Sequence, residues 1–278
     1  MSWLGRRAHA VTALVALAFL WVSLAWAPAA SALSLPGPLV DTQWLAQNLG
    51  QPELYVLDVR TQPDGYRQER IPGAVYVNPL ETLVDRTHPV EGMAATREQF
   101  EGAMRRLGIR RQDPVVVYDD QRSLWAARVY WVFKLYRHPQ VAVLNGGLLR
   151  WKAEQRPVER GPVPARNVAP SDYQASPADR SIVADWKAVR EAMGQAAICD
   201  ARSPREYAGL DVRAARGGHV PEAINVEWIL ATNPDGTFKS PEQLRTLYAR
   251  AGLGPEAGRE IIVYCQTGVR AAHTWFVL

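Results

Sequence analysis

An internal duplication constrains this 278-residue chain more than any other feature. Three short motifs recur in the same order in the two halves of the sequence. They pair residues 54–60 with 197–202, 71–77 with 220–226, and 114–119 with 260–265. The separations, 142, 149 and 146 residues, are nearly constant, which a chance similarity would not produce. The chain therefore contains two copies of one structural unit.

Each copy contains a continuous apolar run, at residues 115–118 and 261–264. Such runs are typical of strands that are buried on both faces of a parallel sheet. Strands and helical patterns alternate along both copies, and that order requires crossover connections. We therefore predict an α/β fold with two tandem domains, each a mostly parallel sheet flanked by helices.

A predicted helix precedes each of these strands, over residues 96–107 and 240–251. Apolar residues recur in both segments at helical spacing. Thr96 and Ser240 begin capping signatures, with Gln or Glu side chains two to three residues later. Gly108 and Gly252 follow the predicted helices, where glycine commonly ends a helix.

We place the first domain at residues 36–155 and the second at 181–278, joined by a linker over 156–180. The linker is rich in Pro, Ala, Arg and Ser and has no periodicity. The counterparts of Asn145 and Trp151 in the second copy would lie beyond residue 278. We therefore expect that the second domain is C-terminally truncated. A fragmentary sequence is favoured, because a fold that lacked these elements would expose an edge of its sheet. A viable shorter fold is the alternative.

Residues 1–32 resemble an export signal rather than part of the fold. Arg6 and Arg7 precede an apolar run over 11–27, and small residues around Ala32 suit a signal peptidase. We predict cleavage after Ala32 and an exported, periplasmic protein, with no other contact to a membrane. An uncleaved N-terminal anchor is the alternative, because the apolar run is slightly long for a signal peptide.

Composition excludes several classes of protein. The net charge is +4 and no run of Lys and Arg forms a basic stripe, so we expect no nucleic-acid partner. The ten tryptophans lack interleaved basic residues and suit core packing. Two cysteines are too few for a disulfide-rich scaffold. Cys199 ends an apolar run and is expected to be a buried thiol; a resolving cysteine is the less favoured reading.

Cys265 has the surroundings of a nucleophile. It follows a buried strand and precedes a predicted helix over 271–278, so it faces backbone N–H groups at the positive end of the helix dipole. Arg270 adds a full positive charge, and Gly268 permits a tight loop that can hold an anion. These groups favour a reactive thiolate.

The sequence resembles the tandem-domain rhodanese family, in particular bacterial thiosulfate sulfurtransferases. The residues that carry the resemblance are 265–271, Asp200-Ala201-Arg202 with Tyr207 and Gly209, 218–221, and Asn145-Gly146-Gly147-Leu148 with Trp151. The resemblance covers nearly everything after residue 32.

The resemblance implies a double displacement in which Cys265 takes sulfur from thiosulfate or 3-mercaptopyruvate and passes it to cyanide or a thiol. It implies no metal or organic cofactor, and we expect a monomer whose only partners are these small molecules. The implied donor site comprises Gln266, Thr267, Gly268, Val269 and Arg270, together with Arg202. Arg270 favours the dianion thiosulfate as donor.

Several alternatives stay open. Four residues separate Cys265 from Arg270, as in sulfur-transferring members, whereas related phosphatases have five. Arg202 recurs as Arg60 in the copy without a nucleophile, which favours an ion pair with the nearby aspartate over catalysis. Glu206 stands where the family often has an arginine that binds the donor. A non-catalytic sulfur-binding or partner-binding protein, or an inactive fragment, is the competing hypothesis.

The first copy has Asp119 where the second has Cys265, and by residue count Leu124 where the second has Arg270. It therefore lacks both the nucleophile and the cation. Inactive first domains are usual in the family that the sequence resembles, and there they cover and shape the active one.

Overall fold

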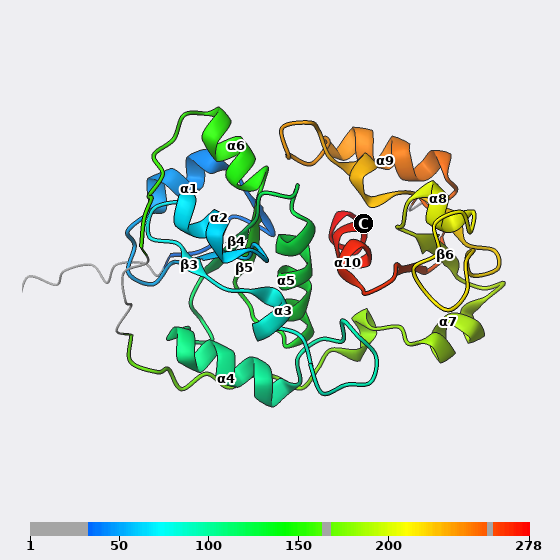
Figure 1. Cartoon of the computed structure of the whole chain (residues 1–278), viewed down its shortest axis with the longest axis horizontal. Coiled ribbons are helices and arrows are strands. Elements are labelled where there is room, and N and C mark those ends of the chain that lie inside the picture. Colours follow the sequence, from blue (N-terminus) through cyan, green and yellow to red (C-terminus); the bar gives the residue numbers. More distant parts are fainter. Residues whose placement is uncertain (1–32, 163–167, 255–257) are drawn as a thin grey trace, which may run out of the picture. The chain divides into compact units, whose positions relative to one another are not determined.

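The first half of the chain forms one five-stranded parallel sheet. The computed structural model describes residues 33–162, 168–254 and 258–278, so the predicted signal peptide and its cleavage lie outside the described residues. The strand order is β1-β5-β4-β2-β3, and Figure 1 labels β3, β4 and β5 of this sheet. The strands are β1 (Leu39–Val40), β2 (Tyr55–Asp58), β3 (Val75–Tyr76), β4 (Val115–Tyr118) and β5 (Val141–Leu144).

Helices cover both faces of this sheet. They are α1 (Thr42–Asn48), α2 (Pro63–Gln68), α3 (Pro79–Thr82), α4 (Arg97–Leu107), α5 (Leu124–Leu135) and α6 (Gly147–Ala153). Alternate residues of β4 point to opposite sides of the sheet. Val117 packs in the core formed with α4 and α5, whereas Val116 packs in the core formed with α1 and α6.

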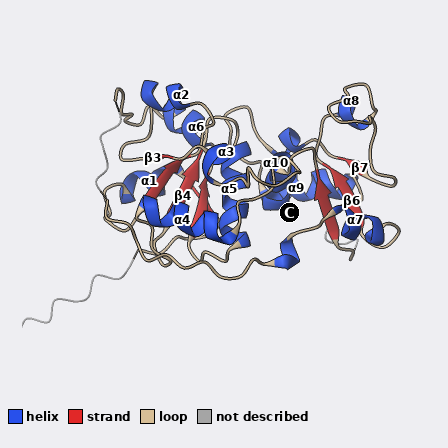
Figure 2. Ribbon diagram, turned by 60° about the horizontal axis from the view of Figure 1, so that its bottom comes forward, coloured by secondary structure: helices blue, strands red, loops and turns tan. Residues whose placement is uncertain are grey.

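The second half repeats the central part of this arrangement as a three-stranded parallel sheet, in the order β7-β6-β8 (Figure 2). The strands are β6 (Ala197–Asp200), β7 (Ile224–Asn225) and β8 (Ile261–Tyr264). The helices are α7 (Trp186–Ala192), α8 (Pro204–Tyr207), α9 (Pro241–Arg250) and α10 (Val269–Val277), with 3-10 turns at η1 (Arg180–Ile182) and η2 (Trp228–Ala231). The predicted α/β class with parallel sheets and flanking helices is confirmed.

The predicted helix signals are found in both halves. Thr96 and Ser240 each form a capping box with a glutamine three residues later. Gly108 ends α4 in the left-handed conformation, with φ of 75°. In the second half, α9 ends at Arg250, two residues before Gly252, the glycine that the sequence suggested.

The prediction that both apolar strands are buried on both faces is confirmed for β4 and wrong for β8. All four residues of β4 are buried, whereas only Ile262 is buried in β8 and its neighbours are half-buried. The two strands differ in the number of neighbouring strands that pair with them. Strand β4 lies between β2 and β5, but within the described residues β8 pairs with β6 alone.

The last helix of the second half packs on the first half. Helices α5 and α10 lie side by side in the structure, and Trp275 and Phe276 of α10 join the core that contains Val129 and Phe133. The rings of Tyr130 and Phe276 meet edge to face with centroids 4.8 Å apart. The helix that follows Cys265 is therefore held in place by the half that lacks a nucleophile.

Among the described residues, no helix is both long enough and apolar enough to cross a bilayer.

Candidate active site

Cys265 lies directly after β8, where the chain turns into α10. We call residues 265–270 the cysteine loop. Gly268 is the N-cap of α10 and has φ of 78°, a left-handed conformation that glycine adopts without steric cost. Its N–H donates a hydrogen bond to the Cys265 Sγ over 3.1 Å. The thiol is half-buried and unpaired. A backbone donor and the start of a helix therefore face the sulfur, and both stabilise negative charge there.

The first half has an anion of its own at the equivalent place. The Asp119 carboxylate is buried and accepts N–H hydrogen bonds from Gln121, Ser123, Trp125 and Ala126, at 2.7 to 2.9 Å. Burial raises the pKa of the Asp119 carboxyl, and these four hydrogen bonds oppose the rise. This loop therefore binds its own carboxylate through the turn and the first N–H groups of α5.

The loop of the first half is one residue longer than the cysteine loop. Counted from the first helical residue, Trp125 rather than Leu124 is the counterpart of Arg270. The residue count in the sequence pointed to Leu124 because it could not detect the inserted residue. With either residue, the first half lacks a cation at this position.

The cysteine loop leaves backbone donors free. The N–H groups of Arg270 and Ala271 correspond to the two that bind the second oxygen of Asp119. Across the described part of the chain, neither N–H has a hydrogen-bond acceptor. Free N–H groups in the first turn of a helix form a site for an anion. The loop can therefore hold a negatively charged atom attached to the sulfur of Cys265.

Arg270 is committed to an acidic partner. Its two terminal nitrogens donate to both oxygens of Glu206 over 2.6 and 2.9 Å. Glu206 is 2% exposed, and the hydrogen bond from Arg270 lowers the pKa of its carboxyl to about 2, against the effect of burial. Much of the positive charge predicted to bind the donor is thus neutralised. The sequence flagged Glu206 as a departure from the family but could not show its partner.

The remaining loop residues differ in their surroundings. Gln266 is exposed, and its Nε2 donates to the carbonyl of Arg213 over 2.6 Å. Thr267 lies against Gly92 of the first half, because a Cβ at Gly92 would fall 2.7 Å from the Thr267 carbonyl oxygen. Val269 is the first residue of α10. These positions bring Gln266 to Arg270 together around Cys265; their contacts with a donor stay predictions.

Arg202 is bound as a structural ion pair. It donates to both carboxylate oxygens of Asp200 and to the Gly218 carbonyl. In the half without a nucleophile, Arg60 pairs with Asp58 in the same way and also binds a backbone carbonyl. Because the arrangement recurs without a reactive cysteine, it favours the loop-holding role for Arg202 over a contact with the donor.

Cys199 is the second thiol of the chain and has a different environment. It is fully buried and is not part of a disulfide, and its burial confirms the predicted buried strand thiol. Burial raises the pKa of the Cys199 thiol to about 12. A buried thiol with a raised pKa forms little thiolate and is a poor nucleophile.

Arg128 is a basic side chain near the loop that the sequence reasoning missed. It belongs to α5 of the first half, is 7% exposed, and its Nη2 donates to the Gly92 carbonyl over 2.7 Å. A Cβ at Gly268 would lie 3.0 Å from its Nη1. One signal was available in the sequence, since Arg128 is the only charged residue between Leu124 and Phe133, a predominantly apolar stretch.

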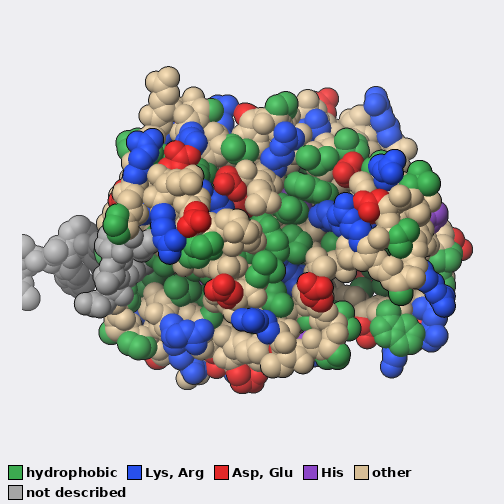
Figure 3. All heavy atoms as spheres, in the orientation of Figure 1, with side chains coloured by type: hydrophobic (Ala, Val, Ile, Leu, Met, Phe, Trp, Pro, Cys, Tyr) green, Lys and Arg blue, Asp and Glu red, His purple; other side chains and the backbone are tan. Residues whose placement is uncertain are grey.

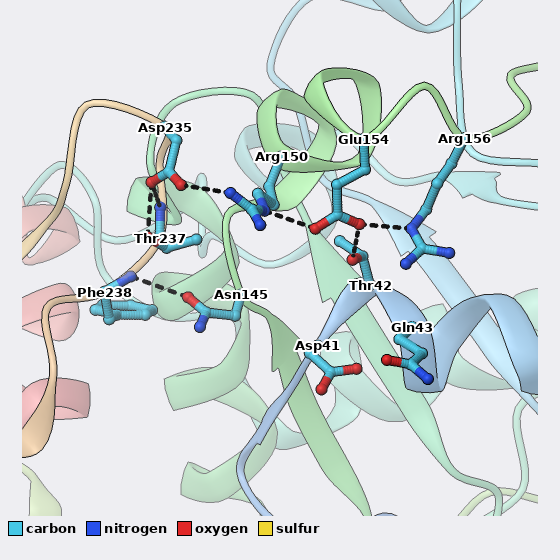
Figure 4. A pocket seen from close by; sticks show the side chains of 10 residues that line it. All are labelled: Asp41, Thr42, Gln43, Asn145, Arg150, Glu154, Arg156, Asp235, Thr237 and Phe238. Atoms are coloured by element: carbon cyan, nitrogen blue, oxygen red, sulfur yellow. Dashed lines mark hydrogen bonds and ion pairs between the residues drawn. The ribbon is translucent and has the colours of Figure 1, made fainter.

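A pocket of about 400 Å³ lies elsewhere, between α6 and the segment before α9 (Figure 4). Arg150 binds Glu154 and Asp235 there, and the Phe238 N–H donates to Asn145. These contacts join the two halves, and the pocket contains no residue of the cysteine loop. We interpret it as a polar contact between the halves.

Within residues 33–162, 168–254 and 258–278, no group of His, Cys, Asp and Glu side chains could hold a metal ion. On the face drawn in Figure 3, Lys and Arg side chains are interspersed with Asp and Glu side chains.

Comparison with known proteins identifies the repeated unit. The family model described as "Rhodanese-like domain" matches residues 41–154 and 185–278. A Mycobacterium tuberculosis protein named "Putative thiosulfate sulfurtransferase" is 38% identical over 248 residues, 86% of this chain and 87% of its own. The sulfur carrier protein TtuD of Thermus thermophilus is 38% identical over 256 residues, 87% of each chain.

A solved structure gives the same result for the fold. SseA from Escherichia coli, a 3-mercaptopyruvate sulfurtransferase with the rhodanese fold, superposes with a TM-score of 0.75 and 29% identity, covering 86% of this chain and 92% of that one. The chain therefore belongs to the rhodanese-like family, with one copy of the domain in each half.

Proposed function

We propose that this protein is a sulfurtransferase that carries sulfane sulfur on Cys265. The observation that best supports this is the hydrogen bond from Gly268 to the Cys265 Sγ, at a helix start with free N–H groups at Arg270 and Ala271. A persulfide extends the cysteine by one sulfur atom and bears its negative charge there. Free N–H groups next to the thiol suit that charge.

The reaction proceeds in two displacements. The Cys265 thiolate attacks the outer sulfur of thiosulfate, an S–S bond forms to Cys265, and the bond to the sulfonate sulfur breaks to release sulfite. A nucleophile then attacks the outer sulfur of the persulfide. Cyanide leaves as thiocyanate, or a thiolate leaves as a new persulfide, and the Cys265 thiolate is regenerated. Charges and atoms balance without any external oxidant or reductant.

We propose thiosulfate as the donor and 3-mercaptopyruvate as the alternative. The names of relatives at 38% identity support thiosulfate, and the SseA similarity supports the alternative. The sequence argument from Arg270 is weaker than expected, because Glu206 neutralises much of that charge. A comparison of initial rates with each donor, using cyanide as acceptor, distinguishes the two.

The test of the central proposal is mass spectrometry of the intact protein after incubation with thiosulfate. We expect a gain of one sulfur atom that cyanide removes, and no gain in Cys265→Ser. Cys199→Ala is the matched control, because the other thiol is buried, and it should gain sulfur as the parent protein does. A folded protein that gains no sulfur from either donor would instead support a non-catalytic binding protein.

We also propose that the protein acts as an exported monomer. The composition of residues 1–32 supports export. N-terminal sequencing of the protein recovered from the periplasm tests cleavage after Ala32, and recovery with the membranes would support an anchor. Light scattering of the purified protein tests the monomer.

A further inference from the structure

Arg128 is a buried cation without an acidic partner. Its side chain is 7% exposed, and its guanidinium lies 4.7 Å from the centroid of the Trp131 ring. Its one hydrogen bond goes to a neutral acceptor, the Gly92 carbonyl. Within the part of the chain that the structure describes, no carboxylate lies at ion-pair distance from it. An unpaired buried charge is costly, so its presence beside a candidate site points to a use for the charge.

This cation lies against the cysteine loop. The Nη1 atom of Arg128 is 3.0 Å from where a Cβ of Gly268 would be, and Gly268 is the residue whose N–H binds the Cys265 sulfur. The same guanidinium is hydrogen-bonded to Gly92, which lies against Thr267. Arg128 is thus wedged between a segment of the first half and the loop that contains the nucleophile.

The other arginines near the loop differ from Arg128 because each has an acidic partner. Arg270 is paired with Glu206, and Arg202 is paired with Asp200. Burial lowers the pKa of Arg128 to about 10, and interaction with the Cys265 sulfur opposes this effect. The Cys265 sulfur therefore interacts with Arg128 across the boundary between the halves, and it also interacts with Arg270 of its own loop, whose charge Glu206 offsets.

We propose that Arg128 supplies the positive charge that holds an anionic sulfur at Cys265, and the negative end of an incoming donor, in the cysteine loop. The half without a nucleophile then completes the site of the other half. Arg128 is a positioning residue, because it acts on the reacting atoms through the loop. The part that concerns the donor rests on the proposed function, whereas the effect on anions at Cys265 does not.

The first test uses alkylation of Cys265 by iodoacetate, an anion, and by iodoacetamide, which is neutral. Both reagents react with the thiolate, so the thiolate content cancels when the rate with iodoacetate is divided by the rate with iodoacetamide. This ratio reports the local electrostatic field at Cys265. For the parent protein we expect a ratio at least about threefold above that of a neutral free thiol such as N-acetylcysteine amide. A ratio equal to that of the free thiol would overturn the proposal without any variant.

Variants then assign the charge. Arg128→Met should lower the ratio about threefold or more, and Arg128→Lys should keep it within about twofold of the parent. Lys134→Met removes a cation from the same helix and should leave the ratio unchanged. If Arg128→Met does not fold, the test compares the ratio of Arg128→Lys, which keeps the charge, with that of Arg128→Gln, whose side chain is polar but neutral. An equal ratio in the parent and the neutral variants contradicts the proposal.

Sulfur donors of different charge test the second part. Arg128→Met should slow the loading of Cys265 more with thiosulfate, a dianion, than with an aromatic thiosulfonate, a monoanion. A merely structural defect would slow both reactions equally and would count against Arg128 as a source of charge. If the parent protein accepts sulfur from neither donor, the proposed function fails, while the alkylation ratios still decide whether Arg128 acts on anions at Cys265.

Discussion

The two halves of the molecule use the same strand-to-helix turn in opposite ways. In the first half, Asp119 fills the turn with its own carboxylate, which four backbone N–H groups bind. In the second half, Cys265 stands at that position with one N–H on its sulfur and two more N–H groups free. The comparison indicates that the turn is an anion site by construction, and that one side chain decides whether the anion is structural or reactive.

Replacing Cys265 or Asp119 with alanine gives the largest expected effects. Cys265→Ala should abolish sulfur loading and change the free energy of unfolding by less than about 1 kcal/mol, because the thiol is half-buried. Asp119→Ala should destabilise the protein by roughly 3 kcal/mol or more, because it leaves several buried N–H groups unpaired. Urea unfolding and the intact-mass assay measure both. Comparable losses of unfolding free energy in the two variants would contradict the idea that the side chain in the turn is structural in the first half and not in the second.

Much of this architecture could be predicted from the sequence, because it depends on local patterns. The apolar runs located β4 and β8, and the Thr96 and Ser240 signatures located helices α4 and α9. The burial of β8 could not be predicted, because it depends on which strands pair with it and not on its own residues.

The predicted site was incomplete for a related reason. Cys265 could be proposed from the sequence alone because the cysteine, the turn and the helix are contiguous. Glu206 and Arg128 lie 59 and 137 positions before Cys265, and only the folded chain brings them to the loop. Arg270 was correctly noted as a loop cation, but its charge could not be judged without its partner Glu206.

Strand β4, in the middle of its sheet, and its counterpart β8, at the edge of the other sheet, provide a second matched pair. Val117 of β4 is fully buried, whereas its counterpart Val263 of β8 is half-buried. Val117→Ala should lower the free energy of unfolding by about 2 to 3 kcal/mol through the cavity that it leaves. Val263→Ala should cost less than about 1 kcal/mol. Chemical denaturation measures both, and equal losses would mean that β8 is more covered in solution than its exposure indicates.

The Glu206–Arg270 pair has no equivalent in the first half, where Gly65 and Trp125 occupy the matching helix positions. The pKa of the Glu206 carboxyl is lowered, so the pair stabilises the protein above the ordinary pKa of glutamate and is lost as pH falls towards 2. Glu206→Gln should cost roughly 2 kcal/mol at pH 7.

The same substitution should lower the KM for thiosulfate a few-fold, because the positive charge of Arg270 is no longer offset by a carboxylate. Steady-state kinetics with thiosulfate and cyanide measure this effect, and Glu242→Gln, at an exposed position of α9, is a control. A raised KM with unchanged stability would indicate that Glu206 itself helps to bind the donor.

A buried histidine in each half gives the smallest expected effect. Burial lowers the pKa of His138 and of His273 to about 4. Each is neutral in the folded protein but gains a proton on unfolding below pH 6.5, so stability is greatest above that pH and falls as pH drops towards 4. Between pH 7 and 5.5 each should account for about 1 kcal/mol.

Replacing one histidine at a time separates the two halves. His273→Phe keeps a ring between Trp228 and Phe238 and should reduce the loss of unfolding free energy between pH 7 and 5.5 by about half of the histidine contribution. It also removes one hydrogen bond, from Nε2 to the Arg122 carbonyl. His138→Phe should flatten the curve equally but lower stability more at every pH, because two groups, the Tyr173 hydroxyl and the Asp113 carbonyl, lose a partner. Denaturation series at several pH values measure both effects. An unchanged pH dependence in His273→Phe would mean that this ring becomes protonated without unfolding, and that the contact between α5 and α10 opens more easily than the core of the first half.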